Sequence, residues 1–433
     1  MRSAAVCALA SVGIWLWSMQ PARAQALPAG PDFWVGGDLE LSHFPSVAID
    51  DERWFGVAYV TLFYFWPEAC GFSDSGVWQG CQALDASGAG FWSQHPVDIA
   101  TIGVDDLLIV WETTLPGPPE ETLIRGRRMS AHAVLLTDPF DVASSELDHP
   151  RDPRVAALPS SQVIVVWVDD SSDGTDDSGS SIQARFFTTD GSPLGPRFQV
   201  NTTVLGNQTV PDVAAAPDGR FVVTWESESS AGSDDSGTSI QIRRFDAEGD
   251  PIGSDEQVNT YISADQRNPR VACAGDGSFV VVWDSDGSSG NDDSSLSIQA
   301  RIFGDDGAPL GSDFQVNSYV ESIQNEPAVA AMADRSFEVV WTSDGSPGDD
   351  DSFESIQRQA FDADGGMVGS QLQVNTTTYS SQWTPDIAMT PEGDLIIVWT
   401  SYGDGLKGRI FRQPLLADGF ESGDTSAWSA TVP

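Results

Sequence analysis

Pairs of adjacent aspartates recur in this sequence at a fixed distance from a tryptophan. Four acidic loops, which follow Trp167, Trp225, Trp283 and Trp341, contain neither lysine nor arginine. Nine and ten residues past the tryptophan stand Asp176 and Asp177, Asp234 and Asp235, Asp292 and Asp293, and Asp350 and Asp351. Three residues past it stand Asp170, Glu228, Asp286 and Asp344. Adjacent carboxylates repel each other by about 1 kcal/mol per close pair even in water, so a compensating partner is expected.

Calcium is the partner that suits this composition. It is a hard cation that takes roughly six to eight oxygens from carboxylates, carbonyls and hydroxyls in flexible loops, and the acidic loops also contain serine and glycine. We therefore predict calcium as a cofactor, bound by the acids named above. Two other interpretations stay open, namely loops that are simply solvated and pairing with a recurrent arginine of the third strand. That arginine stands at Arg127, Arg185, Arg243, Arg301 and Arg409, with Gln359 as the exception.

Other chemistry leaves few traces in the sequence. The histidines His43, His95, His132 and His149 show no metal-ligand spacing, and no nucleophile-elbow, Walker or dinucleotide motif stands in a suitable context. A carboxylate pair for glycoside hydrolysis stays open, but none of the 64 acids is singled out for it. The sequence therefore designates no catalytic residue.

The acidic loops belong to a long repeat. Its prolines stand at Pro153, Pro211, Pro269, Pro327 and Pro385, and its tryptophans from Trp167 to Trp399, both at steps of 58 residues. Weaker copies start near 45 and 96, which makes seven. Seven copies of a four-strand unit predict an all-β fold, a seven-bladed β-propeller with four-stranded antiparallel blades.

One copy shows how the strands would follow each other. We predict strands at 271–273, 279–283, 297–303 and 314–317, of which the first is small and apolar and the second apolar throughout. In this order the acidic loops join the second and third strands and share one face with the crossovers between blades. The last copy has no good fourth strand, so we expect a strand within 33–44 to close the ring. Residues 25–32 are expected to be flexible.

The ends of the chain differ from the repeats. Residues 1–24 have an apolar run and an Ala-Arg-Ala site typical of a signal peptide, so the propeller is expected over 25–417. The tail at 418–433 could be a sorting segment. We expect export, either secretion or cell-surface placement, with no membrane span after cleavage of the leader. A monomer is expected.

The net charge limits the partners that the protein can bind, and the cysteines indicate the redox state of its compartment. The net charge of −43 becomes −45 when Arg2 and Arg23 leave with the leader, and such a field repels nucleic acid, which we exclude as a partner. Cys70 and Cys81 flank a short loop, and in an oxidising compartment a disulfide between them is the simplest interpretation. Cys273 is expected to be a buried free thiol.

The repeat, written PxVAxxxDGxFVVxW with SIQARxF at 297–303 and FQVN at 314–317, resembles repeats of secreted bacterial proteins. It is also similar in outline to FG-GAP propellers of the integrin type. That resemblance implies calcium in D-x-D-x-D-G loops, although the FG and GAP signatures themselves are absent.

These observations favour a non-catalytic binding or cell-surface interaction module with calcium-ordered loops and an extracellular protein or carbohydrate ligand. One alternative is a propeller hydrolase or lyase that acts on extracellular polysaccharide, and another is a structural envelope or matrix protein. The centre of the ring discriminates among them. An enzyme should place acids, tyrosine or histidine that depart from the repeat there, whereas a scaffold should place only repeat-equivalent residues.

Overall fold

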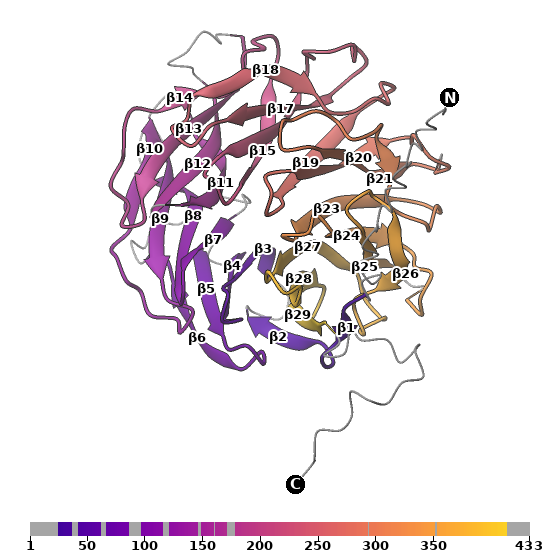
Figure 1. The fold of residues 1–433 in the computed structure, drawn as a ribbon. Coiled ribbons are helices and arrows are strands. Elements are labelled where there is room, and N and C mark those ends of the chain that lie inside the picture. Colours follow the sequence, from indigo (N-terminus) through magenta and orange to yellow (C-terminus); the bar gives the residue numbers. More distant parts are fainter. Residues whose placement is uncertain are drawn as a thin grey trace, which may run out of the picture.

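The protein is a ring of seven β-sheets (Figure 1). The computed structural model describes residues 25–36, 42–61, 66–85, 97–115, 121–145, 149–159, 161–170, 178–292, 294–350 and 353–413. The predicted leader and the tail at 418–433 lie outside these ranges. No helix long and apolar enough to cross a membrane occurs in the described part of the chain.

Each sheet is one blade, and its strands are antiparallel and follow each other in sequence. Blades 1 to 3 comprise β3 (Ser42–Ile49), β4 (Phe55–Thr61), β5 (Trp66–Phe72) and β6 (Trp78–Ala83); β7 (Val97–Gly103), β8 (Asp106–Leu115), β9 (Glu121–Met129) and β10 (Phe140–Ser145); β11 (Arg151–Leu158), β12 (Gln162–Asp169), β13 (Ser181–Thr188) and β14 (Phe198–Gln199). Blades 4 and 5 comprise β15 (Gln208–Ala215), β16 (Phe221–Ser227), β17 (Ser239–Phe245) and β18 (Pro251–Gln257); β19 (Gln266–Cys273), β20 (Phe279–Asp286), β21 (Leu296–Phe303) and β22 (Phe314–Gln315). Blade 6 comprises β23 (Gln324–Ala331), β24 (Phe337–Asp344), β25 (Glu354–Phe361) and β26 (Met367–Gln373), and blade 7 contains β27 (Gln382–Met389), β28 (Leu395–Ser401) and β29 (Gly405–Arg412).

The first strand of every blade lies innermost. Strands β3, β7, β11, β15, β19, β23 and β27 surround the centre in Figure 1, and each contacts the inner strands of both neighbouring blades. The predicted all-β propeller with seven four-stranded blades is confirmed. The start of each inner strand pairs with the end of the second strand, so the acidic loops lie at the end of the ring where the inner strands begin.

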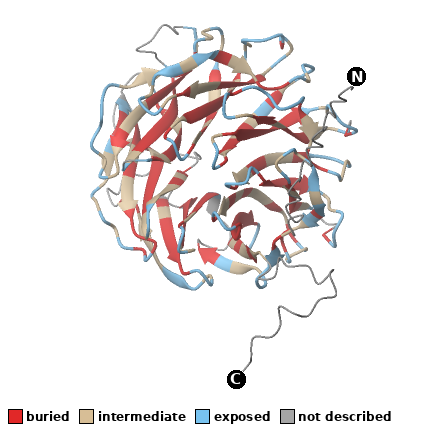
Figure 2. Ribbon diagram, viewed as in Figure 1, coloured by how far each residue is buried: buried red, intermediate tan, exposed pale blue. Residues whose placement is uncertain are grey.

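Recurrent tryptophans join the blades. Trp225 packs against Ile164, Val166 and Ile182 of the preceding blade, and equivalent clusters surround Trp111, Trp167, Trp283, Trp341 and Trp399. In blade 1, Tyr59 takes this place against Ile396 and Val398 of blade 7. These side chains are at most 1% exposed, and buried residues follow the second strands of the blades in Figure 2. The ring is thus held by seven equivalent apolar interfaces.

The N-terminal segment closes the ring. Strand β2 (Phe33–Gly36) pairs with β29, and so does β1 (Leu27–Pro28), which lies in the segment that the sequence suggested was flexible. The expectation of flexibility over 25–32 is therefore wrong. Asp32 Oδ2 accepts the Thr376 N–H at 2.8 Å, as Asp313 accepts the Thr260 N–H in blade 5. The run Asp-Phe-Trp-Val at 32–35 thus stands for the Asp-Phe-Gln-Val at 313–316.

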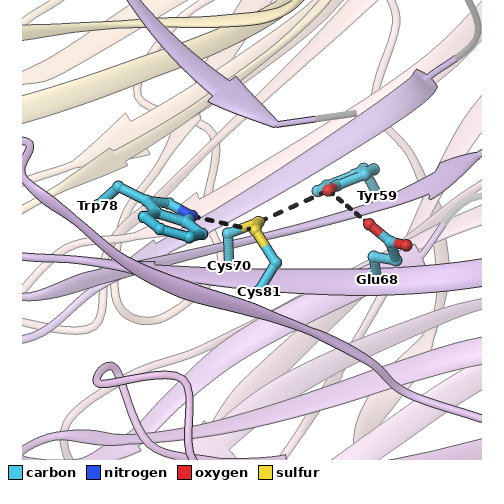
Figure 3. Close-up of a disulfide and its surroundings, with 5 residues drawn as sticks. All are labelled: Tyr59, Glu68, Cys70, Trp78 and Cys81. Atoms are coloured by element: carbon cyan, nitrogen blue, oxygen red, sulfur yellow. Dashed lines mark hydrogen bonds between the residues drawn. A yellow bond between two sulfur atoms is a disulfide. The ribbon is translucent and has the colours of Figure 1, made fainter. Parts of the chain in front are cut away.

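Blade 1 carries a disulfide between Cys70 and Cys81, which lie opposite each other on β5 and β6 (Figure 3). The Trp78 indole N–H donates to Cys81 Sγ at 3.2 Å, and the Tyr59 hydroxyl donates to Glu68 at 2.8 Å. Cys273 is a free thiol, and burial raises its pKa to about 12. A thiol with such a pKa is a poor nucleophile at neutral pH.

Candidate functional site

The first aspartate of each described pair is a buried structural residue. Asp234, Asp292 and Asp350 are at most 4% exposed, and each accepts a hydrogen bond at 2.6 to 2.7 Å from the side-chain amide of an asparagine. These asparagines, Asn259, Asn317 and Asn375, end the FQVN-type strand, and the Oδ1 atom of each accepts a backbone N–H of the third strand. The Asn–Asp contact therefore fastens each loop to its own blade.

The other loop acids have separate partners or lie at the surface. Glu228 accepts two hydrogen bonds from Asn207 at 2.9 Å, Asp170 pairs with Arg151, and Asp344 accepts from the Ser322 hydroxyl. Asp235 and Asp286 are exposed. Asp176, Asp177, Asp293 and Asp351 lie outside the described residues. Within the described ranges, no group of three or more histidine, cysteine, aspartate or glutamate side chains could hold a metal ion.

The third-strand arginines do not pair with these loops. Arg243, Arg301 and Arg409 donate instead to backbone carbonyls of the preceding blade at 2.5 to 2.7 Å, on Val200, Val258 and Val374. The expectation of pairing with loop carboxylates is wrong for these residues. The guanidinium groups also lie about 5.5 Å from the centroid of a phenylalanine ring two residues later, so the recurrent arginine joins neighbouring blades.

A cavity of about 360 Å³ lies at the centre of the ring, in the first half of the inner strands. We call it the central funnel. Its volume lies in the range of small-molecule sites. All seven blades contribute equivalent backbone positions to it, because each inner strand enters with the same register against its second strand.

One layer of the funnel is polar and differs from blade to blade. The residue that pairs with the position before the recurrent aromatic is, in blades 1 to 7, Ser46, Asp98, Arg154, Asp212, Arg270, Ala328 and Asp386. We call this set the axial ring. The following residues are uniformly β-branched, namely Val47, Ile99, Val155, Val213, Val271, Val329 and Ile387, and alanine comes next in every blade. The repeat thus keeps its apolar layers and varies its polar one.

The axial aspartates each bind the next blade. Asp98, Asp212 and Asp386 accept the backbone N–H of Val155, Val271 and Val47 at 2.7 to 2.8 Å. Asp98 also accepts the Ser46 hydroxyl at 3.0 Å, and an Arg154 nitrogen lies 3.9 Å from Asp212. Burial raises the pKa of all three carboxyls, that of Asp386 to about 6. Arg154 opposes the rise at Asp98, whereas the Asp98 charge adds to it at Asp386.

The residue before the proline carries backbone strain at the entrance of the funnel. Phe44, Asp152, Val210, Asn268, Glu326 and Thr384 all have φ between 49° and 55°. Each lies at a bulge, where the register of the inner strand shifts. A positive φ is an outlier for the β-branched Val210 and Thr384, and costs about 1 to 3 kcal/mol per residue. The strain recurs at the equivalent position of six blades, so it belongs to the repeat.

A chain of carboxyl groups lies in the wall between blades 4 and 7. Asn268 donates to Asp284 at 2.7 Å, and Glu326 accepts the Thr342 hydroxyl at 3.1 Å and the Thr384 N–H at 3.0 Å. Burial raises the pKa of Asp284 well above its usual value and that of Glu226 to about 7. Of the group, Asn268, Glu326 and Thr384 line the funnel.

Sequence reasoning missed the axial ring. The sequence holds one signal for it: the type of the residue after the recurrent proline changes from copy to copy. Blade 2 weakens this pattern, since Asp98 follows Pro96 by two residues instead of one. Only the strand register places Asp98 beside Arg154 and Ser46.

No family model and no curated protein matches this sequence. Among solved structures, it is similar to a polysaccharide lyase of family PL25, an ulvan lyase, with a TM-score of 0.56 and 8% identity over 90% of this chain and 96% of that one. A protein of unknown function from Dyadobacter fermentans has a TM-score of 0.51 and 9% identity over 90% and 99%. An α-L-arabinofuranosidase from Fusarium graminearum has a TM-score of 0.48 and 10% identity over 90% and 98%. At these identities the likeness establishes the propeller fold.

Proposed function

We propose that this protein is an exported enzyme that cleaves extracellular polysaccharide in its central funnel. The observation that carries the proposal is the axial ring, which replaces repeat-equivalent residues by Asp98, Arg154, Asp212, Arg270 and Asp386 in a cavity of ligand size. This is the departure from the repeat expected of an enzyme. The ulvan lyase shows that a propeller of comparable extent can serve as the scaffold for polysaccharide degradation.

The carboxyl groups of the ring suit general acid and base catalysis. Asp386, whose pKa burial raises to about 6, holds a proton in most molecules below that pH and in a minor fraction at neutral pH. In the protonated form it would donate the proton to the glycosidic oxygen as the bond breaks. Burial also raises the pKa of Asp98, but Arg154 and the donors on both carboxylate oxygens oppose the rise and favour its anion. It would accept a proton from the water that attacks the anomeric carbon. The proton given by Asp386 and the one taken by Asp98 balance over one hydrolytic turnover.

Hydrolysis fits the charge better than elimination. A lyase acts on uronates, which are anionic, and the net charge of −43 repels them. Neutral or cationic glycans are not repelled by this charge.

The test is to incubate the mature chain, residues 25–433, with a panel of neutral, cationic and uronate polysaccharides and to measure reducing ends. Ultraviolet absorbance of unsaturated products would reveal elimination. We expect hydrolysis, reduced by about 10²- to 10⁴-fold in Asp386→Asn and Asp98→Asn. Asn retains an acceptor for the N–H of the next blade, so these variants should fold. Asp305→Asn, an exposed residue on the opposite face, is the control. Absence of cleavage across the panel would refute the proposal.

Calcium at the acidic loops stays a prediction. In the described loops the first aspartate of each pair already accepts a hydrogen bond from an asparagine side chain. The groups left to bind a cation are the exposed Asp235 and the exposed acids three residues past the tryptophan. Calcium there would order the loops around the funnel and would take no part in the reaction. Export, the monomeric state and an extracellular carbohydrate partner likewise stay parts of the proposal.

A further inference from the structure

Blades 4, 5 and 6 each hold their acidic loop with a pair of glutamines. In blade 5, Gln299 and Gln315 lie opposite each other on the third and fourth strands. The Ser288 hydroxyl of the loop joins them, because it accepts from the Gln299 side chain at 3.1 Å and donates to that of Gln315 at 2.8 Å. The Asp292 N–H also donates to Gln315. Blades 4 and 6 repeat these contacts.

Blade 7 has neither the long loop nor the two glutamines. Its second and third strands are joined over 402–404, against 228–238 in blade 4. The strand register places Lys407, the single lysine of the sequence, at the position of Gln299. It places Trp34 at the position of Gln315, and Trp34 is 48% exposed. Blade 7 thus presents to solvent a position that the acidic loop contacts in blades 4 to 6.

Further departures from the repeat gather at the same end of blade 7. Tyr402 stands three residues past the recurrent tryptophan, where blades 3 to 6 have an acid, and it is 63% exposed. Its ring centroid lies 6.1 Å from that of Trp383. Tyr379, which is 70% exposed, donates its hydroxyl to Asp404 at 2.7 Å, and the Lys407 ammonium lies 3.7 Å from the same carboxylate. We call this group the blade 7 platform; it comprises Trp34, Tyr379, Trp383, Tyr402, Asp404 and Lys407.

The platform extends from the rim of the ring to the funnel. In Figure 1 the strands β2, β29, β28 and β27 follow each other from the edge of blade 7 to the centre. Trp34 lies on β2 and Trp383 on β27, so the platform crosses three strand spacings, or about 14 Å. Trp383 directly precedes Thr384, which lines the funnel. The platform is therefore as long as a short oligosaccharide and ends at the funnel.

The platform carries little net charge, unlike the acidic loops on the same face. Lys407 balances Asp404, and Tyr402 replaces the acid of the other blades. Aromatic side chains offer flat apolar faces together with polar tips, and a few polar groups among aromatic ones are typical of ligand sites. Such a surface suits a neutral sugar chain, whose rings have apolar C–H faces and hydroxyl edges.

We infer that the blade 7 platform is a carbohydrate-binding site that takes a neutral, pyranose-based polysaccharide and leads it into the funnel. Trp34 and Tyr402 would stack on sugar rings. Asp404, Lys407 and the tyrosine hydroxyls would form hydrogen bonds with sugar hydroxyls. Binding at the platform is independent of the catalytic proposal, whereas delivery of the chain into the funnel rests on the proposed function.

The experiment is calorimetric titration of the mature chain, residues 25–433, with hexasaccharides of β-1,4-linked glucose, mannose and xylose and with a hexagalacturonate. We expect a neutral hexasaccharide to bind and the galacturonate to bind more weakly. Trp34→Gln and Tyr402→Asp each introduce the residue that another blade has at the same position, so these variants should fold. Each should weaken binding of the neutral hexasaccharide by about tenfold or more. Trp78→Gln, which removes a similarly exposed tryptophan at the opposite end of the ring, should leave it unchanged.

The remaining outcomes separate binding from cleavage. Equal affinity in the parent and in both platform variants, or failure of all three neutral hexasaccharides to bind, would overturn the inference, and cleavage of polysaccharide would still support the proposed function. Loss of affinity in the platform variants, without cleavage of any polysaccharide by the parent, would support the platform and overturn the proposed function. If an uncharged apolar hexapeptide bound more tightly than the sugars and through the same two residues, the platform would be a protein-docking surface and the inference would be wrong.

Discussion

The acidic loops and the central funnel are both rich in carboxylates, but they are built in opposite ways. In the loops the equivalent aspartate accepts a hydrogen bond from the equivalent asparagine in blades 4, 5 and 6, as Asp292 does from Asn317. In the funnel one backbone position holds serine, aspartate, arginine or alanine, depending on the blade. Repetition therefore marks what each blade needs in order to fold, and its loss marks the place where we propose that the seven blades act together on a ligand.

Blade 6 departs from the repeat at a place outside the funnel. In blade 6 the third strand reads Ile-Gln-Arg-Gln instead of Ile-Gln-Ala-Arg, and Arg358 lies buried against Glu338 at 2.6 Å. Arg358 also donates to the Ala26 carbonyl and lies 4.1 Å from the Phe411 ring centroid. This departure from the repeat lies at the seam with blade 7, where it holds the N-terminal segment. Its role should concern stability.

The largest effect on stability is expected from Arg358→Met. The change removes the guanidinium that pairs with the buried Glu338 carboxylate, which costs about 3 to 5 kcal/mol. Urea unfolding would measure the loss. The double variant Glu338→Val, Arg358→Ile reproduces Val222 and Ile242 of blade 4 and should restore most of the loss. If Arg358→Met lowered polysaccharide cleavage without lowering stability, Arg358 would have a functional role instead of a structural one.

A smaller loss of stability is expected from Asn317→Ala. The variant removes the donor to the buried Asp292 and the acceptor of the Ile298 N–H, which should cost about 2 to 3 kcal/mol. Asn291→Ala, an exposed change in the same loop, is the matched control for thermal unfolding. Equal melting temperatures for the two variants would contradict a structural role for the Asn–Asp contact.

The pH dependence of stability should reveal Asp386. Because its pKa is raised to about 6, against about 3.9 in an unfolded chain, the native state holds this proton more tightly. The stabilising contribution is complete below about pH 4 and is lost as the pH rises through about 6, by up to about 3 kcal/mol. Asp386→Asn should lack this loss, as melts across that window would show. Parallel curves for the two proteins would mean that Asp386 titrates normally.

Calcium should give the smallest effect on stability. A cation bound only by the native state adds about 1.4 kcal/mol at ten times its Kd, which would appear as a rise in Tm over a magnesium control at matched ionic strength. Asp235→Asn should reduce the rise. If calcium and magnesium shift the melt equally, the acidic loops are ordered by their own hydrogen bonds.

The fold could be predicted from the sequence because each blade packs against its neighbour through the same residue types at the same spacing. The 58-residue step of Trp167 to Trp399 reports an interface that recurs around the ring. The closing strand β2 carries a weaker signal in the sequence, since Asp32 to Val35 repeats only four residues of the motif. The structure shows the equivalence, because Asp32 accepts the same kind of backbone N–H as Asp313.

The site could not be predicted in the same way. Periodic acids such as Asp292 drew attention to the loops, yet burial and the contact with Asn317 explain them. Asp98, Arg154 and Asp386 come together only through closure of the ring and the strand register, which no local motif encodes. Backbone strain at Val210 and Thr384 is likewise invisible without coordinates.

The most direct test of the account compares one funnel acid with one loop acid in the same assay. Reducing ends released from the best polysaccharide substrate would be measured for the mature chain, for Asp386→Asn and for Asp235→Asn. We predict a loss of about 10²-fold or more for Asp386→Asn and a change within about twofold for the exposed loop variant. Full activity in Asp386→Asn together with loss in Asp235→Asn would contradict the account and move the function from the funnel to the loops.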